Sequence, residues 1–340
     1  MRIYPHVLAI TIGLLTGAAP ALAAPQKART IRWFVAHDRG DTPFTAIIKD
    51  FARSVEAKSD GALKVEFVAS GAPEAQLDEA AFQQIAEGRA DMAQIPAWSA
   101  GVGIFEMPFL FRSYEHAELV FEGPIGKKLV ADIATASKNR VRGFAFTYSG
   151  GYRILVGRVP VRRIADFKAL RMRKDSGLTD LMKEWGVSPI DADPANAERP
   201  IAQIGSGRID LEETEVNRLA LTRTEHPDVL KNVEFANLTR HRMYVTALVA
   251  NEKFFASLPD KLRELLSTEI EALAVAERKL SIGLERSNLE FLAKSGMKLV
   301  ELPEAERAAF IKSGEAVHKK YPGLSVLIRD IREAKALSGS

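Results

Sequence analysis

The sequence of 340 residues contains no cysteine. This absence excludes a disulfide framework, a thiolate metal site and a lipid-anchored N-terminal cysteine. Neither sign of charge is in large excess, because the sequence has 47 Lys and Arg residues and 44 Asp and Glu residues. The formal net charge is +3. A chain so nearly balanced gives no reason to expect nucleic acid or an anionic membrane as its partner.

The common motifs of nucleotide-binding proteins and hydrolases are also missing. There is no Gly-x-x-x-x-Gly-Lys-Ser/Thr loop, no glycine-rich dinucleotide turn, no His-Glu-x-x-His and no Gly-x-Ser-x-Gly elbow. The six histidines are scattered at positions 6, 37, 116, 226, 241 and 318, so no helical pair offers itself to a metal. We therefore expect no cofactor, no metal and no enzymatic activity.

One acidic cluster keeps a catalytic alternative open. Residues 210–215 read Asp-Leu-Glu-Glu-Thr-Glu, which could serve as acid–base machinery or as a cation site. The competing interpretation is that Glu213 supports nearby arginines while the other carboxylates face water.

The one long apolar run lies at the N-terminus, in MRIYPHVLAITIGLLTGAAPALAAPQ. Arg2 precedes the apolar residues 7–19 and Ala21-Leu22-Ala23 follows them, the order typical of a cleaved secretory signal. The alternative is a membrane anchor, but the run is shorter than the roughly 20 residues that span a bilayer. We expect a signal peptide over residues 1–23 and a periplasmic mature chain. Loss of Arg2 leaves that chain a formal net charge of +2.

The rest of the chain alternates between strand and helix patterns. A strand is predicted over residues 31–36, and Thr42-Pro43 then resembles an N-cap with proline in the first turn. Apolar residues at 44, 47, 48, 51 and 55 form one helix face. Further strands and helices follow up to a strand over 141–146, and the alternation restarts with a strand over 152–156 after Gly150-Gly151. This order predicts the α/β class.

A long helix is predicted near the C-terminal end. Residues 259–295 carry recurring leucines and no internal proline, which corresponds to a helix of roughly 50 Å. Such a helix can lie across two lobes, so we predict a two-lobed clamshell in which a cleft can bind a small ligand. The predicted lobe I comprises residues 24–150 and about 239–278, and lobe II comprises 151–238 and about 279–335.

Two arginines stand out in the basic segment GYRILVGRVPVRRIADFKALRMRKD, residues 151–175. Arg153 and Arg173 each lie inside a short apolar run, where an unpaired cation is costly to bury. Each could bind an anionic ligand or form an internal salt bridge to a core carboxylate. For Arg173 the residues alone favour the salt bridge.

The order of motifs resembles the solute-binding proteins of the tripartite ATP-independent periplasmic (TRAP) transporters, of the DctP type. The resemblance covers about residues 31–334 and rests on FARSVEAKSDGALKVEFVASG, IAEGRADMAQ, FEMPFLFRSYEHAELVFEGPIGKKL, GSGRIDLEE and NLTRHRMYVTALVANEKFFASLP. It implies a periplasmic protein that captures an organic acid between its lobes and delivers it to the membrane subunits of a permease. It also implies a monomer without a nucleotide site. Solute sensing beside a signalling receptor is the alternative, and an exported enzyme is a weaker one.

The resemblance assigns site residues one by one. In that family an arginine after a D-[FL]-K-G-L motif contacts the solute's carboxylate, and FKALRMR places Arg173 at that position. The Gly-x-Arg context of Arg153 matches a second carboxylate-binding arginine. A guanidinium suits this role, because its planar fork matches a carboxylate and stays charged. Glu213 corresponds to a family acid.

Two further positions and several departures complete the expected site. His37 follows the first strand and Trp98 follows the strand over 91–95; we expect pocket contacts, against the alternatives of an exposed loop histidine and a core tryptophan. Thr214 replaces the family's solute-binding asparagine. The segments PANAERPIAQI and APEAQLDE lack the family's pocket aromatic, tyrosine and Gln-Leu-Gly step. The kind of acid therefore stays open.

Overall fold

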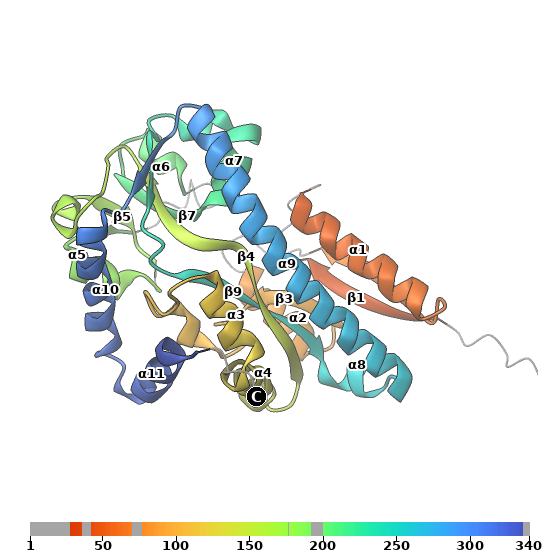
Figure 1. Ribbon diagram of the computed structural model, residues 1–340. Helices are drawn as coiled ribbons and strands as arrows, with labels where there is room; N and C mark the ends of the chain where they lie inside the picture. The colour runs from red at the N-terminus through yellow and green to blue at the C-terminus, as the bar shows by residue number, and fades with distance from the viewer. Residues whose placement is uncertain (1–27, 36–41, 70–76, 176, 192–199, 336–340) are drawn as a thin grey trace, which may run out of the picture.

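The computed structural model describes residues 28–35, 42–69, 77–175, 177–191 and 200–335, and its strands and helices alternate along the chain (Figure 1). The strands are β1 (Arg29–Val35), β2 (Leu63–Ala69), β3 (Met92–Pro96), β4 (Val141–Gly157), β5 (Arg171–Arg173), β6 (Ser188–Ile190), β7 (Leu211–Glu215), β8 (Phe235–Leu238), β9 (Met243–Asn251) and β10 (Lys298–Glu301). The α-helices are α1 (Pro43–Lys58), α2 (Leu77–Ala86), α3 (Tyr114–Glu122), α4 (Pro124–Ala136), α5 (Thr179–Trp185), α6 (Ala202–Gly205), α7 (Val216–Glu225), α8 (Glu252–Ala256), α9 (Asp260–Lys294), α10 (Glu304–His318) and α11 (Ser325–Glu333). The α/β prediction is confirmed.

The strands form two sheet regions that share β4. In the first region the order is β2-β1-β3-β9-β4, with β1 parallel to both its neighbours and β9 antiparallel to both of its own. In the second region β4 pairs with β7 and β8, β7 continues to β5 and β6, and β10 lies beside β8. A single 17-residue strand therefore connects the two regions.

The continuity of β4 corrects the sequence-based expectation of two strands separated by Gly150-Gly151. Both glycines have positive φ, +98° and +82°, and the pairing with β9 shifts register between Tyr148 and Tyr152. A Cβ atom on Gly151 would overlap the hydroxyl oxygen of Tyr114. The two glycines thus make a local irregularity inside one strand, because glycine adopts left-handed backbone angles without steric cost.

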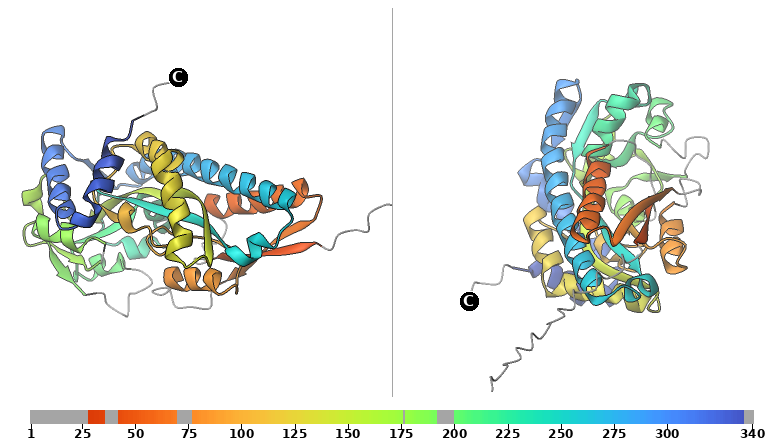
Figure 2. Two further views of the ribbon diagram at one scale, coloured as in Figure 1. Left: turned by 90° about the horizontal axis from the view of Figure 1, so that it is seen from below. Right: turned by 90° about the vertical axis from the view of Figure 1, so that its right-hand side faces the viewer.

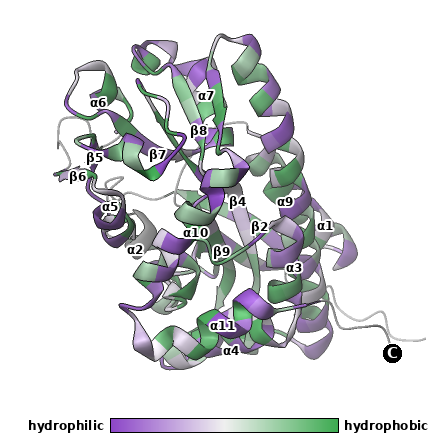
Figure 3. Ribbon diagram, turned by 60° about the vertical axis from the view of Figure 1, so that its left-hand side comes forward, coloured by the Kyte–Doolittle hydropathy of each residue, from purple (hydrophilic) through white to green (hydrophobic). Residues whose placement is uncertain are grey.

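Hydrophobic clusters pack against both sheet regions. Phe146 belongs to one cluster of the first region and Ile270 to the other, while Ile154 and Leu155 belong to the two clusters of the second. Ile154 and Leu155 are neighbours on β4 but belong to different clusters, because successive side chains of a strand point to opposite faces of the sheet. The helices that cover the sheets mix apolar and polar residues along their length (Figure 3), as amphipathic helices do.

Helix α9 extends across both regions, as its predicted length of roughly 50 Å requires (Figures 1 and 2). It contacts α1, α7 and β4. Leu266 and Ile270 are buried with the first sheet region, and Leu292 is buried with the second. Within the described residues, neither α9 nor any other helix has the length and apolar character that crossing a bilayer demands.

The two C-terminal helices divide between the regions. Phe310 of α10 packs in a cluster of the second region, beside α5. Ile328 and Ile331 of α11 are buried in a cluster of the first region, and Nε2 of His116 lies 3.0 Å from the carbonyl oxygen of Ile331. Helix α11 therefore packs with the first sheet region, although the predicted lobe II extends to about residue 335. The division into lobes stays a prediction.

Candidate functional site

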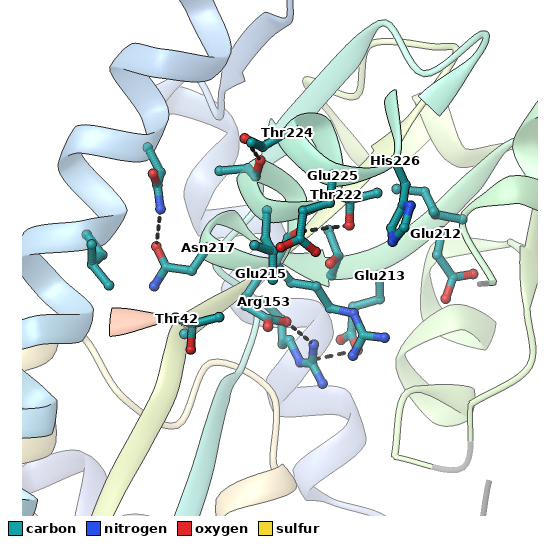
Figure 4. Close-up of a pocket in the computed structure, with 18 of the residues that line it drawn as sticks. Thr42, Arg153, Glu212, Glu213, Glu215, Asn217, Thr222, Thr224, Glu225 and His226 are labelled. Atoms are coloured by element: carbon teal, nitrogen blue, oxygen red, sulfur yellow. Dashed lines mark hydrogen bonds and ion pairs between the residues drawn. The ribbon is translucent and has the colours of Figure 1, made fainter. Parts of the chain in front are cut away.

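A cavity of about 990 Å³ lies between the N-terminal end of α1 and the surface formed by β7, α7 and α9 (Figure 4). Thr42 and Phe44 line it from the α1 side, and Arg153, Arg173 and Glu213 line it from the other. The Thr42 side chain also caps α1, where its oxygen accepts a hydrogen bond from the backbone N–H of Thr45. The volume is at the upper end of the range for sites that hold small ligands.

Arg173 reaches the cavity because β5 and β7 are parallel neighbours. Their register sets Met172 against Leu211, which brings Arg171 beside Asp210 and Arg173 beside Glu212. Nε and Nη2 of Arg173 lie 2.9 and 2.8 Å from the same oxygen, Oε1 of Glu212. The other oxygen, Oε2, is buried and has no hydrogen-bond partner among the described residues. Burial raises the pKa of Glu212 to about 7, although the charge of Arg173 opposes this rise.

Arg153 reaches the same cavity from β4. It stands opposite Glu215 in the antiparallel pairing of β4 with β7, and Nη1 lies 2.6 Å from Oε2 of Glu215. Its Nε is 3.7 Å from Oε2 of Glu213, and its guanidinium carbon lies 4.6 Å from the centre of the Tyr244 ring. Burial disfavours the cation, but the charges of Glu215 and Glu213 outweigh this effect and raise the pKa of Arg153.

A third arginine, Arg242, binds Glu213 in a bidentate pair. Its Nε lies 2.8 Å from Oε1 and its Nη2 lies 2.6 Å from Oε2. The same guanidinium contacts Glu106 at 2.5 Å and Asp175 at 3.3 Å. Burial alone would raise the pKa of Glu213, but Arg242 and Arg153 hold it well below its usual range. Glu213 is therefore an anion that organises the arginines.

His241 completes the surroundings of Glu213. Its Nε2 lies 2.7 Å from Oε1 of Glu213, and its Nδ1 lies 2.8 Å from Oγ1 of Thr239. Burial lowers the pKa of His241, so the ring is neutral at pH 7 despite its acidic neighbour. The neutral ring then donates from Nε2 to Glu213 and accepts the Thr239 hydroxyl proton at Nδ1.

Four of the six predicted site residues line this cavity: Arg153, Arg173, Glu213 and Thr214. Thr214 is 7% exposed and lies opposite Ile154 on β4. Trp98 is 43% exposed in the turn after β3 and is absent from the described residues that line the cavity. Its contact with a solute stays a prediction, and His37 lies outside the described residues.

The salt-bridge alternative that the sequence left open is observed for both arginines. Arg173 is paired with Glu212 and Arg153 with Glu215, yet both side chains also line the cavity. Each arginine thus forms an internal ion pair and also lines the cavity. Binding of a solute carboxylate by either arginine stays a prediction.

Sequence reasoning missed much of this cluster. Arg242 directly precedes the apolar strand that begins at Met243, but Arg240 and His241 stand before it, so it reads as the end of a basic turn. Glu106 and Asp175 give no signal of their own, because only the folding of distant segments brings them to Arg242. The interpretation that the carboxylates around Glu213 face water is wrong for Glu212 and Glu215, because both residues are less than 5% exposed.

Known proteins resemble this chain over most of its length. The family model "Bacterial extracellular solute-binding protein, family 7" (DctP) matches residues 35–323. Among curated proteins, the C4-dicarboxylate-binding protein DctB of Bacillus subtilis is 22% identical over 308 residues, 87% of this chain and 83% of the relative.

Two solved structures show the same fold. A TRAP periplasmic solute-binding protein of Citrobacter koseri with bound D-glucuronate has a TM-score of 0.74 at 19% identity, covering 90% of this chain and 100% of the other. The sugar-acid-binding protein DctPAm of Advenella mimigardefordensis with galactonate has a TM-score of 0.74 at 20% identity, covering 91% and 98%. The fold is therefore that of the two-lobed periplasmic binding proteins. Since the family match extends over most of its length, the chain belongs to the DctP family of bacterial extracellular solute-binding proteins.

Proposed function

We propose that the protein captures a small organic acid in the cavity lined by Arg153 and Arg173 and delivers it to the membrane subunits of a TRAP permease. The observation that carries the proposal is that two guanidinium groups from adjoining parts of one sheet line the same cavity. The relatives add support, since one is named for C4-dicarboxylates and two contain sugar acids. Arginine is the side chain best suited to a carboxylate, because it offers a planar pair of donors.

Capture works by exchange of partners at Arg173. In the structure this guanidinium donates to a single oxygen of Glu212. A solute carboxylate can then bind Arg173 beside Glu212 or displace Glu212 from it. The net gain is a few kcal/mol at most, because the desolvation of both ions offsets much of their attraction. Specificity then comes from the remaining wall, where Thr214 offers a hydroxyl group and Phe44 an apolar face.

The proposal includes closure of two lobes around the solute. We assign residues 24–150 and about 239–278 to one lobe and 151–238 and about 279–323 to the other, with α11 joining the first. The chain crosses between the sheet regions within β4, between β8 and β9, and along α9, which supports this division. Closure is driven by the higher affinity of the closed state for the solute, and it creates the surface that the permease recognises.

Export belongs to the same proposal. Residues 1–23 act as a signal peptide that is removed before Ala24, and the mature protein works in the periplasm as a monomer that binds without catalysis. The basic, apolar and small-residue order of this segment supports the assignment. Mass spectrometry of the protein secreted into the periplasm tests it: a first residue other than Ala24 would correct the cleavage site, and an intact N-terminus would contradict export by cleavage.

The central experiment is a thermal-shift screen of the mature protein against monocarboxylates, dicarboxylates, sugar acids and amino acids. A bound ligand raises Tm by mass action. Arg173→Ala should abolish the shift, whereas Arg171→Ala should retain it. Arg171 is the matched control because it lies on the same strand and also pairs with a carboxylate, that of Asp210, but is absent from the described residues that line the cavity. An unchanged shift in Arg173→Ala would refute the assigned role of Arg173.

A further inference from the structure

Carboxylates outnumber cations around the cavity. Among the described residues the linked cluster holds three guanidinium groups and five carboxylates: Arg153, Arg173 and Arg242 with Glu106, Asp175, Glu212, Glu213 and Glu215. The more exposed Arg218 and Glu225 line the cavity as well and add one charge of each sign. A solute that brought only a carboxylate would enlarge the negative surplus beside a cluster whose charged side chains are mostly buried.

The longer internal segments outside the described residues contain more acidic than basic residues. Segments 36–41, 70–76 and 192–199 contain Arg39 and Arg199 against Asp38, Asp41, Glu74, Asp193 and Glu198. Wherever these side chains lie, they contribute more negative than positive charge in total.

Glu212 adds a second, independent observation. Its side chain is 5% exposed and lines the cavity, and its Oε2 has no hydrogen-bond partner among the described residues. A buried carboxylate oxygen without a donor is costly, so it is a site where a ligand N–H group gains most. Asp175 lines the same cavity, and its contact with Arg242 is long at 3.3 Å.

We propose that the solute is a zwitterion, whose carboxylate binds Arg173 and whose ammonium group binds Oε2 of Glu212. This inference rests on the proposed function and narrows the class of organic acid to amino acids. Arg173 on β5 and Glu212 on β7 lie side by side. The carboxylate and ammonium groups of an α-amino acid are also close together, because both are bonded to one carbon atom. An ammonium group supplies one positive charge and three N–H donors, enough for Glu212 and Asp175 together.

The alternative way to balance the charge is uptake of a proton by Glu212 when a plain acid binds. The pKa of about 7 makes this proton accessible near neutrality. A proton supplies only one donor, however, and leaves Asp175 without a new partner. Isothermal titration in two buffers of different ionisation enthalpy separates the two cases, because only the plain acid takes up a proton on binding.

The test uses matched pairs that differ only in an amino and a hydroxyl group: L-alanine and L-lactate, L-leucine and L-2-hydroxyisocaproate, and 5-aminovalerate and 5-hydroxyvalerate. D-glucuronate and L-malate represent sugar acids and dicarboxylates. We expect an amino member to bind at least about tenfold more tightly than its hydroxy partner, with no net proton uptake. Glu212→Gln should weaken the amino member by about tenfold or more and bring the hydroxy member closer to it, while Asp210→Asn, at the equivalent pair outside the cavity, should change neither.

The outcomes separate the two proposals. Binding of a hydroxy acid, D-glucuronate or L-malate in preference to every amino acid, or binding with uptake of a proton, overturns the zwitterion while the organic-acid function stands. Equal binding of both members of a pair also overturns it. If none of these probes binds, or if Arg173→Ala binds as the wild type does, the site assignment fails and the zwitterion fails with it.

Discussion

Arg153 and Glu215 are direct cross-strand partners, and Nη1 of the arginine lies 2.6 Å from Oε2 of the glutamate. Their side chains are only 18% and 4% exposed. Gly150 lies against this pair, because a Cβ atom there would overlap Cγ of Glu215. The wall of the cavity is therefore held by a buried ion pair that needs a glycine beside it.

A double-mutant comparison tests the importance of this pair to the fold. Arg153→Met should cost about 3 kcal/mol of unfolding free energy, because it leaves Glu215 buried without its cation. Arg153→Met combined with Glu215→Gln should cost less than the single change, since position 215 then holds no buried charge without a cation. Urea unfolding measures both, and a double variant less stable than Arg153→Met would contradict the arrangement.

The pH dependence of stability should report on Glu212. Its pKa is raised to about 7 in the folded protein, so its contribution to stability is present below the unfolded pKa of 4.5 and is lost as pH rises through 7. Between about pH 5 and about pH 8 the wild type should lose on the order of 3 kcal/mol relative to Glu212→Gln. Urea midpoints at the two pH values provide the measurement.

Asp210→Asn is the control for this titration. The hydrogen bonds and charge of Arg171 lower the pKa of Asp210, so its contribution is constant above the unfolded pKa. The wild type and this variant should therefore keep the same difference at both pH values. If the difference in stability between the wild type and Glu212→Gln is also the same at both pH values, Glu212 does not titrate in that range.

Arg242 should be the most sensitive residue of the cluster. Arg242→Met removes the cation that Glu106, Asp175 and Glu213 share, and we expect a loss of about 3–5 kcal/mol at neutral pH. The loss should shrink toward about pH 5, because carboxyl groups released from Arg242 take up protons more readily. Thermal unfolding at both pH values checks this, and Arg171→Met, at a more exposed pair, should cost much less. A loss that does not depend on pH would count against this explanation.

Gly151 tests the irregularity in β4. Gly151→Ala forces a side chain into left-handed backbone at φ +82° and against Tyr114, whereas Gly186→Ala meets a similar φ of +74° with no atom within 4 Å. Both should lose about 1 kcal/mol from backbone strain, and Gly151→Ala should lose a further 1–3 kcal/mol, roughly, from overlap. Equal losses of unfolding free energy for the two variants would show that Tyr114 moves aside without cost.

The elements that sequence predicted best are those with long, regular patterns. α1 begins at Pro43 after the predicted cap Thr42, and α9 covers Asp260–Lys294 within the predicted 259–295. α7 was not predicted, since its segment VNRLALTRTE is rich in polar and β-branched residues. It is helical because Val216 and Leu219 are buried against the second sheet region, an effect of tertiary packing.

The site was predictable only in part for a similar reason. A cation inside an apolar run can be seen in the sequence, and this signal found Arg153 and Arg173. The partner of Arg153 is 62 positions away and is chosen by the register of β4 with β7, which local patterns do not encode. The negative surplus of the cavity could therefore emerge only when the strands were paired.

The sharing of α9 between the two sheet regions has a consequence for biosynthesis. Leu262, Leu266 and Ile270 complete a cluster that also contains Trp33 and Phe51 from the first strand and helix. Trp33 and Phe51 can meet Leu63 and Met92 early, but their cluster is finished only after more than two hundred residues beyond Phe51 have been added. The packing of the first strand and helix is therefore completed late in synthesis, by a helix from the far end of the chain.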